Sequence, residues 1–187
     1  MQKVVILDRD GVINHDSENY IRSPAEWLPI EGSLEAIAKL YSAGFRIFVI
    51  TNQSGIARGY LSAESLQAIH QKMLLAVEQS GGRIERVFFC PHHPQDGCQC
   101  RKPQTGLIDQ LRNYLQTDIT GTPFVGDSLS DLQVAHASGC LPILVKTGKG
   151  QQTLRNLTAP LPLVFSDLAA SAQWIIDETG AWPTRPG

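Results

Sequence analysis

The sequence has no long hydrophobic run, and this absence excludes a membrane-spanning helix from the expected fold. Its apolar stretches are short, such as VVIL at 4–7 and FRIFVIT at 45–51, whereas a transmembrane helix needs roughly 20 apolar residues. The N-terminal stretch MQKVVILDRDG also lacks the longer apolar segment and the small-residue cleavage site of a secretory signal. These features predict a cytoplasmic protein that does not bind a membrane.

The chain also lacks a charge excess and is poor in cysteine. Sixteen Lys and Arg against 18 Asp and Glu give a net charge of −2, so the basic excess typical of a nucleic-acid-binding surface is missing. A chain of 187 residues can bury a core without disulfides. In a reducing compartment, clustered Cys and His are metal ligands more often than disulfide partners. We expect one domain over residues 1–187, as a monomer.

Short apolar runs rich in Val, Ile and Phe alternate with amphipathic stretches. Strands are expected at 4–7, 45–51, 86–90, 123–127 and 141–148, with a short last strand beginning at 164. Helices are expected at 33–43, 62–82, 105–115 and 130–139, with a final helix before Gly180 and a loose tail after it. This alternation predicts an α/β fold with a doubly wound, mostly parallel sheet covered on both faces.

Polar side chains follow four of these strands, where ligands bind in such sheets. They are Asp8 and Asp10, then Thr51 and Asn52, then Arg101 and Lys102, and finally Asp127 and Asp131. Two crowded carboxylates need a cation or a shared proton, and Mg²⁺ suits oxygen ligands. Each group alone has an ordinary explanation as a solvated turn, a basic pair or a helix cap. Their joint placement at the strand ends favours a functional site.

The order of these motifs resembles the haloacid dehalogenase-like (HAD) phosphohydrolases, over most of the chain. The family pattern is DxD, then a Thr or Ser, then a Lys, then GDxxxD, and all four occur in order. The resemblance implies a HAD-like, Rossmannoid fold in which Asp8 is the nucleophile and Asp10 the general acid/base. Thr51 and Lys102 would stabilise the transferred phosphoryl group.

The same resemblance implies a catalytic Mg²⁺ held by Asp8, the backbone oxygen of Asp10 and Asp127, with Asp131 in support. Asp8 would form an aspartyl-phosphate, which splits one difficult step into two. Asp10 would protonate the leaving alkoxide and then deprotonate the attacking water. The implied activity is that of a Mg²⁺-dependent phosphoric monoester hydrolase.

The segment CPHHPQDGCQCRKP at 90–103 gathers three of the four cysteines and two histidines. Its four expected zinc ligands are Cys90, His92, Cys98 and Cys100. Such a closed set of four is typical of structural zinc, whereas catalytic zinc keeps one position open. His93 is the rival ligand, and surface residues without a metal are the ordinary alternative. We therefore expect a zinc-bound loop at 90–102 that shapes the substrate mouth, and a buried Cys140 outside it.

Two families of small HAD phosphatases share such a loop and lack a large cap domain. They are the D-glycero-D-manno-heptose 1,7-bisphosphate 7-phosphatases and the histidinol-phosphate phosphatases. Residues 9–50 separate Asp8 from Thr51, too few for a helical cap. TNQSGIARG at 51–59 and CPHHP are similar to the heptose family, although Ser128 stands where some of its members have Lys. Hydrolysis of the heptose C7 phosphate, in lipopolysaccharide precursor synthesis, is therefore expected, with histidinol phosphate as the alternative.

The heptose resemblance also implies where a sugar bisphosphate would bind. Residues 16–20 would contact the sugar or its distal phosphate, and Arg101 would recognise the second anionic group, because Arg suits bidentate phosphate binding. The expected substrate contacts are Asp16, Asn19, Tyr20, Thr51, Asn52, Gln53, Ser54, Arg58, Arg101 and Lys102. His15 is a candidate for the substrate mouth, whereas His70 and His136 fall in helices and are expected in solvent or core.

Two other classes of protein share parts of this pattern. A phosphoacceptor signalling domain also clusters Asp, Thr and Lys on a doubly wound sheet, but its phosphorylated Asp follows a later strand and no zinc loop is expected. A nucleic-acid-binding zinc module would place its loop among basic and aromatic residues, whereas this loop carries Asp96 and one basic pair. Multiple-turnover phosphate release would exclude both classes.

Overall fold

The computed structural model describes residues 3–158 and 161–178. They form a six-stranded sheet in the order β3-β2-β1-β4-β5-β6, and every adjacent pair is parallel. The strands are β1 (Val4–Leu7), β2 (Arg46–Asn52), β3 (Arg86–Cys90), β4 (Pro123–Gly126), β5 (Leu141–Val145) and β6 (Leu163–Phe165). The expected doubly wound parallel sheet is therefore confirmed.

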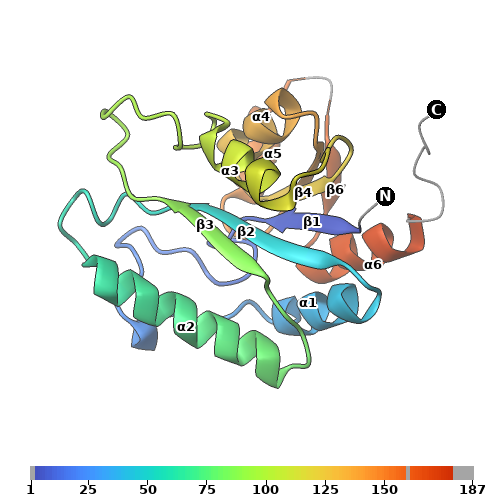
Figure 1. Cartoon of the computed structure of the whole chain (residues 1–187), viewed down its shortest axis with the longest axis horizontal. Helices are drawn as coiled ribbons and strands as arrows, with labels where there is room; N and C mark the ends of the chain where they lie inside the picture. The colour runs from blue at the N-terminus through green and yellow to red at the C-terminus, as the bar shows by residue number, and fades with distance from the viewer. Residues whose placement is uncertain (1–2, 159–160, 179–187) are drawn as a thin grey trace.

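Helices cover both faces of the sheet (Figure 1). They are α1 (Ser33–Ser42), α2 (Ala63–Gln79), α3 (Gly106–Leu115), α4 (Leu129–Ala137), α5 (Gly150–Asn156) and α6 (Leu168–Glu178). Helices α1, α2 and α6 lie on one face, and α3, α4 and α5 lie on the other. No helix among the described residues combines the length and apolar character needed to cross a membrane.

Strand β1 contributes to two hydrophobic cores, because neighbouring side chains of a strand point to opposite faces. Val5 and Leu7 pack in the core under α1, α2 and α6, whereas Val4 and Ile6 pack in the core under α3 and α4. All four side chains are buried. A central strand covered on both faces must be apolar throughout, which is why the run VVIL carries no alternation.

Local sequence signals mark the start of α2 and the end of α1. The hydroxyl of Ser62 accepts the backbone N–H of Ser65 and caps α2. Gly44 follows α1 with a φ of 87°, a left-handed conformation that favours glycine. The boundaries differ by a few residues, since α2 ends at Gln79 rather than at 82.

The structure corrects the expectation for the segment after β5. This strand ends at Val145 instead of continuing to 148, and residues 146–149 form a turn that leads into α5. Helix α5 escaped prediction because its sequence GQQTLRN has almost no apolar face. The short 3-10 helix η1 (Pro24–Glu26) also went unpredicted. The expected loose tail after Gly180 lies outside the described residues.

The connection from β1 to β2 holds no cap domain. It consists of an irregular loop that includes η1, followed by α1. Trp27 anchors this loop with a side chain that is 1% exposed. The ammonium of Lys72 on α2 donates to the carbonyls of Pro24 and Trp27. The absence of a large cap, predicted from the short spacing, is therefore confirmed for the described residues.

Candidate active site

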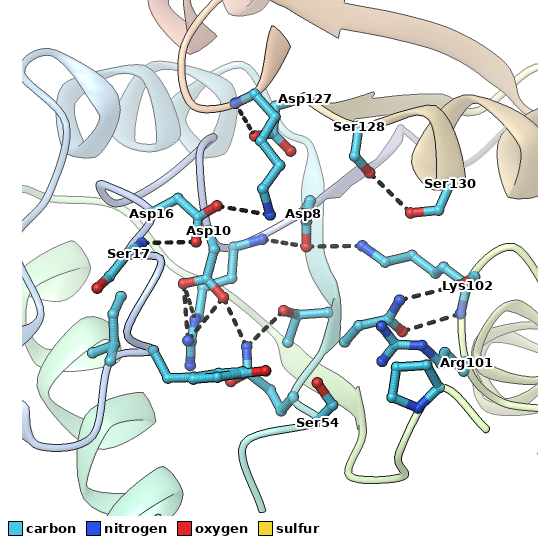
Figure 2. Close-up of a pocket in the computed structure, with 18 of the residues that line it drawn as sticks. Asp8, Asp10, Asp16, Ser17, Ser54, Arg101, Lys102, Asp127, Ser128 and Ser130 are labelled. Carbon is cyan, nitrogen blue, oxygen red and sulfur yellow. Dashed lines mark hydrogen bonds and ion pairs between the residues drawn. The ribbon is translucent and has the colours of Figure 1, made fainter. Parts of the chain in front are cut away.

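The carboxyl ends of β1, β2 and β4 meet at one cavity of about 350 Å³, and the loop after β3 completes it. Figure 2 shows Asp8 at its centre, with Lys102 on one side, Asp10 on the other and Asp127 beyond. Thr51 also lines the cavity. The structure thus brings together the side chains that the four sequence motifs single out.

Lys102 joins two of the carboxylates in this cavity. Its Nζ lies 2.8 Å from Asp8 Oδ1 and 2.6 Å from Asp131 Oδ1, and it donates to the carbonyl of Ile50. The Lys102 side chain is 2% exposed. Burial lowers its pKa, but the charges of Asp131 and Asp8 outweigh burial and raise it above the usual range. Lys102 therefore remains a buried cation.

Three carboxylates are close enough to share a metal ion. Oxygens of Asp8, Asp127 and Asp131 lie within 4.8 Å of one another. Burial and repulsion by neighbouring acids raise the pKa of Asp8 to about 7 and that of Asp127 to about 8. This repulsion is the property that a divalent cation relieves, and a buried all-oxygen cluster suits Mg²⁺.

Two glycines leave room for Asp127. A Cβ added to Gly11 would lie 2.1 Å from Asp127 Oδ2, and one added to Gly148 would lie 2.2 Å from the same atom. The backbone N–H of Lys149 donates to this oxygen at 2.7 Å. Larger residues at either glycine would displace the carboxylate. The fit of backbone around Asp127 supports a metal-binding role for it.

Asp131 is held entirely by protein groups. Its Oδ2 accepts the backbone N–H and the hydroxyl of Ser128, at 3.0 and 2.6 Å, which forms a capping box at the start of α4. Its other oxygen faces Lys102. The Asp131 carboxylate therefore caps α4 and pairs with Lys102 at the same time, so its role as a helix cap does not exclude it from the acid cluster.

Asp10 turns away from the acid cluster and is bound by four donor nitrogens. The guanidinium of Arg9 contacts both carboxylate oxygens at 2.9–3.0 Å, and the amides of Asn14 and Gln53 donate at 2.9 Å. Burial raises the pKa of Asp10, but the Arg9 charge and these hydrogen bonds outweigh it and lower the pKa below its usual value. Asp10 is therefore ionised in this arrangement.

Asn52 and Gln53, the two amide residues after Thr51, line the cavity and also form hydrogen bonds with other residues of the site. Gln53 donates from one Nε2 to both Thr51 Oγ1 and Asp10 Oδ2. Asn52 accepts the backbone N–H of Lys102 and donates to its carbonyl, at 3.0 and 3.2 Å. The end of the Cys/His loop is therefore fastened to the end of β2.

The expected substrate contacts fall on two neighbouring cavities. Nine of the ten line the main cavity, namely Asp16, Tyr20, Thr51, Asn52, Gln53, Ser54, Arg58, Arg101 and Lys102. Asn19 and His15 line an adjacent hollow instead. Nη1 of Arg101 is buried and has no hydrogen-bond partner among the described residues. A buried guanidinium nitrogen beside the cavity is suited to an anionic ligand.

Sequence reasoning missed several residues of the site. Lys149 lines the cavity and its Nζ lies 2.9 Å from Asp16 Oδ2. Lys149 follows β5. The strand-end rule, by which ligands of a parallel sheet bind beyond the carboxyl ends of its strands, could therefore have identified it. Arg9, Asn14 and His70 were also missed as partners around Asp10; the ring nitrogen Nε2 of His70 lies 3.2 Å from Arg9 Nη1. Arg9 and Asn14 lie within four residues of Asp10 in the sequence, whereas nothing in the linear sequence links His70 to them.

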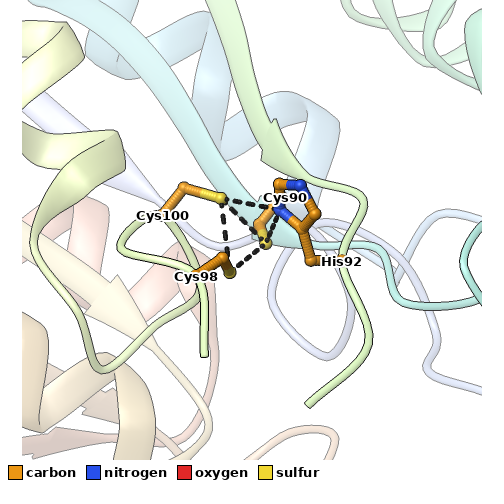
Figure 3. A group of neighbouring side chains, drawn as sticks. All are labelled: Cys90, His92, Cys98 and Cys100. Atoms are coloured by element: carbon orange, nitrogen blue, oxygen red, sulfur yellow. Dashed lines mark hydrogen bonds between the residues drawn. The ribbon is translucent and has the colours of Figure 1, made fainter. Parts of the chain in front are cut away.

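The Cys/His loop forms a compact cluster beside this cavity (Figure 3). The three Sγ atoms of Cys90, Cys98 and Cys100 lie 3.1–3.6 Å from one another. Nδ1 of His92 lies 3.1 Å from Cys100 Sγ and 3.5 Å from Cys90 Sγ. Zinc–sulfur bonds of about 2.3 Å in a tetrahedron place ligand atoms about 3.8 Å apart, so the cluster fits zinc after a small expansion.

Two further predictions concern residues around this cluster. His93 lies outside the group of four, since its Nδ1 accepts the backbone N–H of Gln95 and its own N–H donates to Asp96. The geometry thus favours His92 as the ligand. Cys140 is buried beneath α3 and α4 with the second core, as expected.

Comparisons with known proteins agree with this arrangement. A family model described as HAD-hyrolase-like matches residues 99–171. A Pseudomonas aeruginosa protein named D-glycero-beta-D-manno-heptose-1,7-bisphosphate 7-phosphatase is 49% identical over 178 residues, covering 94% of this chain and 98% of its own. A protein of the same name from Pseudomonas putida is 48% identical over 174 residues, covering 93% and 99%.

A solved structure is similar over nearly the whole fold. It is the D,D-heptose 1,7-bisphosphate phosphatase of B. bronchiseptica, complexed with magnesium and phosphate. The TM-score is 0.91 and the identity 47%, and the match covers 94% of this chain and 99% of the other. This chain therefore has the fold of that phosphatase over almost its whole length.

Proposed function

The chain belongs to the D-glycero-beta-D-manno-heptose-1,7-bisphosphate 7-phosphatases, a family of HAD-like hydrolases, and we propose that it removes the C7 phosphate of this bisphosphate. The observation that carries the proposal is one cavity that holds a buried Asp8–Lys102 pair, with an Arg101 nitrogen beside it that has no hydrogen-bond partner among the described residues. The Asp8–Lys102 pair suits the phosphate that reacts, and the Arg101 nitrogen suits the distal phosphate.

Asp8 is the nucleophile in this proposal. Its backbone continues β1, and the backbone N–H of Arg9 donates to Asp8 Oδ1 at 2.8 Å, as Lys102 does from the other side. These two donors fix one carboxylate oxygen and leave the other to attack phosphorus. The attack forms an aspartyl-phosphate and expels the C7 alkoxide, and water then releases phosphate.

Charge on the reacting phosphoryl group has to be neutralised for this attack to be fast. Lys102 supplies a fixed positive charge, and the Thr51 hydroxyl lies on the neighbouring strand. Mg²⁺ bound by Asp8, Asp127 and the Asp10 carbonyl, with Asp131 in support, would supply further charge neutralisation. The structure positions these protein groups before substrate binds, so little reorganisation is needed.

Asp10 transfers protons in both halves of the reaction. As an ionised carboxylate it is ready to accept a proton from the attacking water in the second half. To protonate the leaving alkoxide in the first half, it must first bind a proton. A phosphate dianion arriving beside it raises its pKa and so favours that protonation.

The zinc cluster has a structural role in this proposal. Cys90 ends β3, and Arg101 directly follows Cys100, the last residue of the cluster. Zinc held by Cys90, His92, Cys98 and Cys100 would set the path of the loop between them. That path delivers Arg101 and Lys102 to the cavity, where Asn52 fixes its end.

In this proposal the second phosphate of the substrate binds at the part of the cavity that Arg101 and Lys149 line. Arg101 provides a guanidinium, and Lys149 provides an ammonium paired with Asp16, which a phosphate could displace. Lys149 also compensates for Ser128, which stands where some family members have Lys. We place the enzyme in the cytoplasm as a monomer that contributes to lipopolysaccharide precursor synthesis.

A comparison of substrates tests the function. The value of kcat/KM is measured for the β and α anomers of the heptose bisphosphate and for histidinol phosphate, and ³¹P NMR identifies the phosphate removed. We expect the β anomer to be preferred and the C7 phosphate to be released over many turnovers. A preference for histidinol phosphate would overturn the substrate, and a single turnover would indicate a phosphoacceptor domain instead.

A further inference from the structure

A histidine on α2 reaches the active site through one buried arginine. Nε2 of His70 lies 3.2 Å from Nη1 of Arg9, whose Nε and Nη2 contact both oxygens of Asp10. The Arg9 residue is 1% exposed and His70 is 9% exposed. The three side chains therefore form a chain of contacts from α2, below the sheet, to the acid/base residue.

The direction of these hydrogen bonds follows from chemistry. A guanidinium has donors only, so Nε2 of His70 must accept and the neutral ring carries its proton on Nδ1. Burial and the charge of Arg9 lower the pKa of His70 to about 3, which keeps the ring neutral. A neutral acceptor at this place satisfies a buried donor of Arg9 without adding charge.

We propose that His70 is a positioning residue, which acts through Arg9 to hold the carboxylate of Asp10 in the orientation for proton transfer. The proposal rests on the phosphatase activity inferred above. Without the acceptor, one buried N–H of Arg9 loses its partner, and the guanidinium can rotate to seek another. The Asp10 carboxylate would then lose the contacts from Arg9 to both of its oxygens, which set its orientation.

This role differs from general support of the fold. Asp10 helps the first half-reaction by protonating the leaving oxygen, which matters greatly for an alkyl alcohol and little for an acidic phenol. A misdirected Asp10 should therefore slow aspartyl-phosphate formation from alkyl phosphates more than from aryl phosphates. Loss of fold or of metal would slow both classes equally.

The test compares His70→Leu, His70→Gln and the wild type on a series of phosphate monoesters, from an alkyl alcohol to an acidic phenol. The value of kcat/KM is used because it reports steps up to the first irreversible one. For His70→Leu we expect a loss of about tenfold or more on alkyl esters and less than about threefold on the most acidic phenol. His70→Gln offers an amide oxygen as acceptor and should recover most of the loss.

A matched control lies on the same helix. Met73 is fully buried in α2 and belongs to the core under α1, α2 and α6, so Met73→Leu disturbs packing of the same helix but keeps the His70–Arg9 hydrogen bond, and it should leave the ratio of alkyl to aryl rates unchanged. If His70→Leu lowers both classes equally, or lowers neither, the proposal is wrong. If His70→Leu does not fold, His70→Asn takes its place, because its side chain is too short to reach Arg9. The same change in the ratio of alkyl to aryl rates is expected for it.

The ester series also separates this proposal from the substrate assignment. Failure of the wild type on the heptose bisphosphate, with hydrolysis of simple esters retained, would overturn the proposed function alone. The dependence of the His70 variants on the leaving group would still decide the role of His70.

Discussion

The ammonium of Lys102 is 2.8 Å from a carboxylate oxygen of Asp8, although the two residues follow different strands of the sheet. The same ammonium contacts Asp131, so one buried cation compensates two buried acids. Such a pair is costly to break, because the remaining charges stay buried without a partner. The proposed nucleophile and the stability of the site therefore depend on the same contact.

Replacing Lys102 by Met should remove both activity and stability. The variant leaves Asp8 and Asp131 without their cation, and we expect a loss of about 3 kcal/mol in the free energy of unfolding. Urea denaturation without added Mg²⁺ measures this loss, and phosphate release in the presence of Mg²⁺ measures turnover. The exposed Lys39 gives the control Lys39→Met, which should change neither. An active, equally stable Lys102→Met would contradict the site.

Replacing Asp8 by Asn should abolish turnover and keep the fold. The amide has nearly the same shape, but it cannot form an aspartyl-phosphate, so we expect kcat to fall at least about a thousandfold. Circular dichroism and the melting temperature check the fold. The half-exposed Asp109 provides the control Asp109→Asn. Substantial activity in Asp8→Asn would exclude Asp8 as nucleophile.

Removal of zinc should lower stability and activity together. If the metal only shapes the loop, strong chelation releases zinc, and after the chelator is removed and Mg²⁺ is restored, Tm and the affinity for the bisphosphate stay low. Metal analysis should show one zinc per chain in the wild type and a reduced content in Cys98→Ser. Cys140→Ser, outside the cluster, should retain zinc. Lost activity at unchanged Tm would instead indicate a catalytic metal.

Arg101→Ala should discriminate between substrates with one and two phosphates. Its buried nitrogen faces no protein partner among the described residues, so its loss should be felt mainly by the distal phosphate. We expect kcat/KM to fall about 100-fold for the bisphosphate and much less for a heptose 7-phosphate, since a charged hydrogen bond contributes about 1.5–3 kcal/mol. Equal losses on the two substrates would place Arg101 on the reacting phosphate.

His70 should make stability depend on pH in a predictable direction. Its pKa is about 3 in the fold and about 6.5 when unfolded. Between these values only the unfolded chain binds the proton, so the free energy of unfolding decreases as pH falls below about 6.5. Relative to His70→Gln, the wild type should lose about 1.4 kcal/mol between about pH 7.5 and 5.5. A constant difference would contradict the neutral, buried ring.

The alternation of apolar runs with amphipathic stretches predicted most of the fold, and the strand-end rule predicted where the candidate site lies. Asp8, Thr51 and Asp127 each follow or end an apolar run, and in a parallel sheet the ends of such runs meet. The Cys/His cluster was predictable for another reason, because its ligands lie within eleven consecutive residues. Both signals are local in the sequence, and neither needs the details of packing.

The missed residues depend on packing across the fold. His70 lies on the buried face of α2, and only the placement of that helix below β2 and β3 (Figure 1) brings it to Arg9. Lys149 directly follows the strand expected at 141–148 and was missed because polar residues were sought after four other strands only. Helix α5 is too polar to show a helical pattern. Tertiary contacts, rather than local propensity, determine these features.

The position of β1 has a consequence for how the enzyme loses activity on heating. This strand is paired on both sides, and the amide of Asp8 is bonded to Val125, so exposing it to hydrogen exchange requires global unfolding. The loop at 90–102 instead follows β3, an edge strand, and can open locally at a lower free energy. Inactivation should therefore begin with opening of this loop and loss of the zinc that we propose for it, while the proposed nucleophile, Asp8, is still protected within an intact sheet.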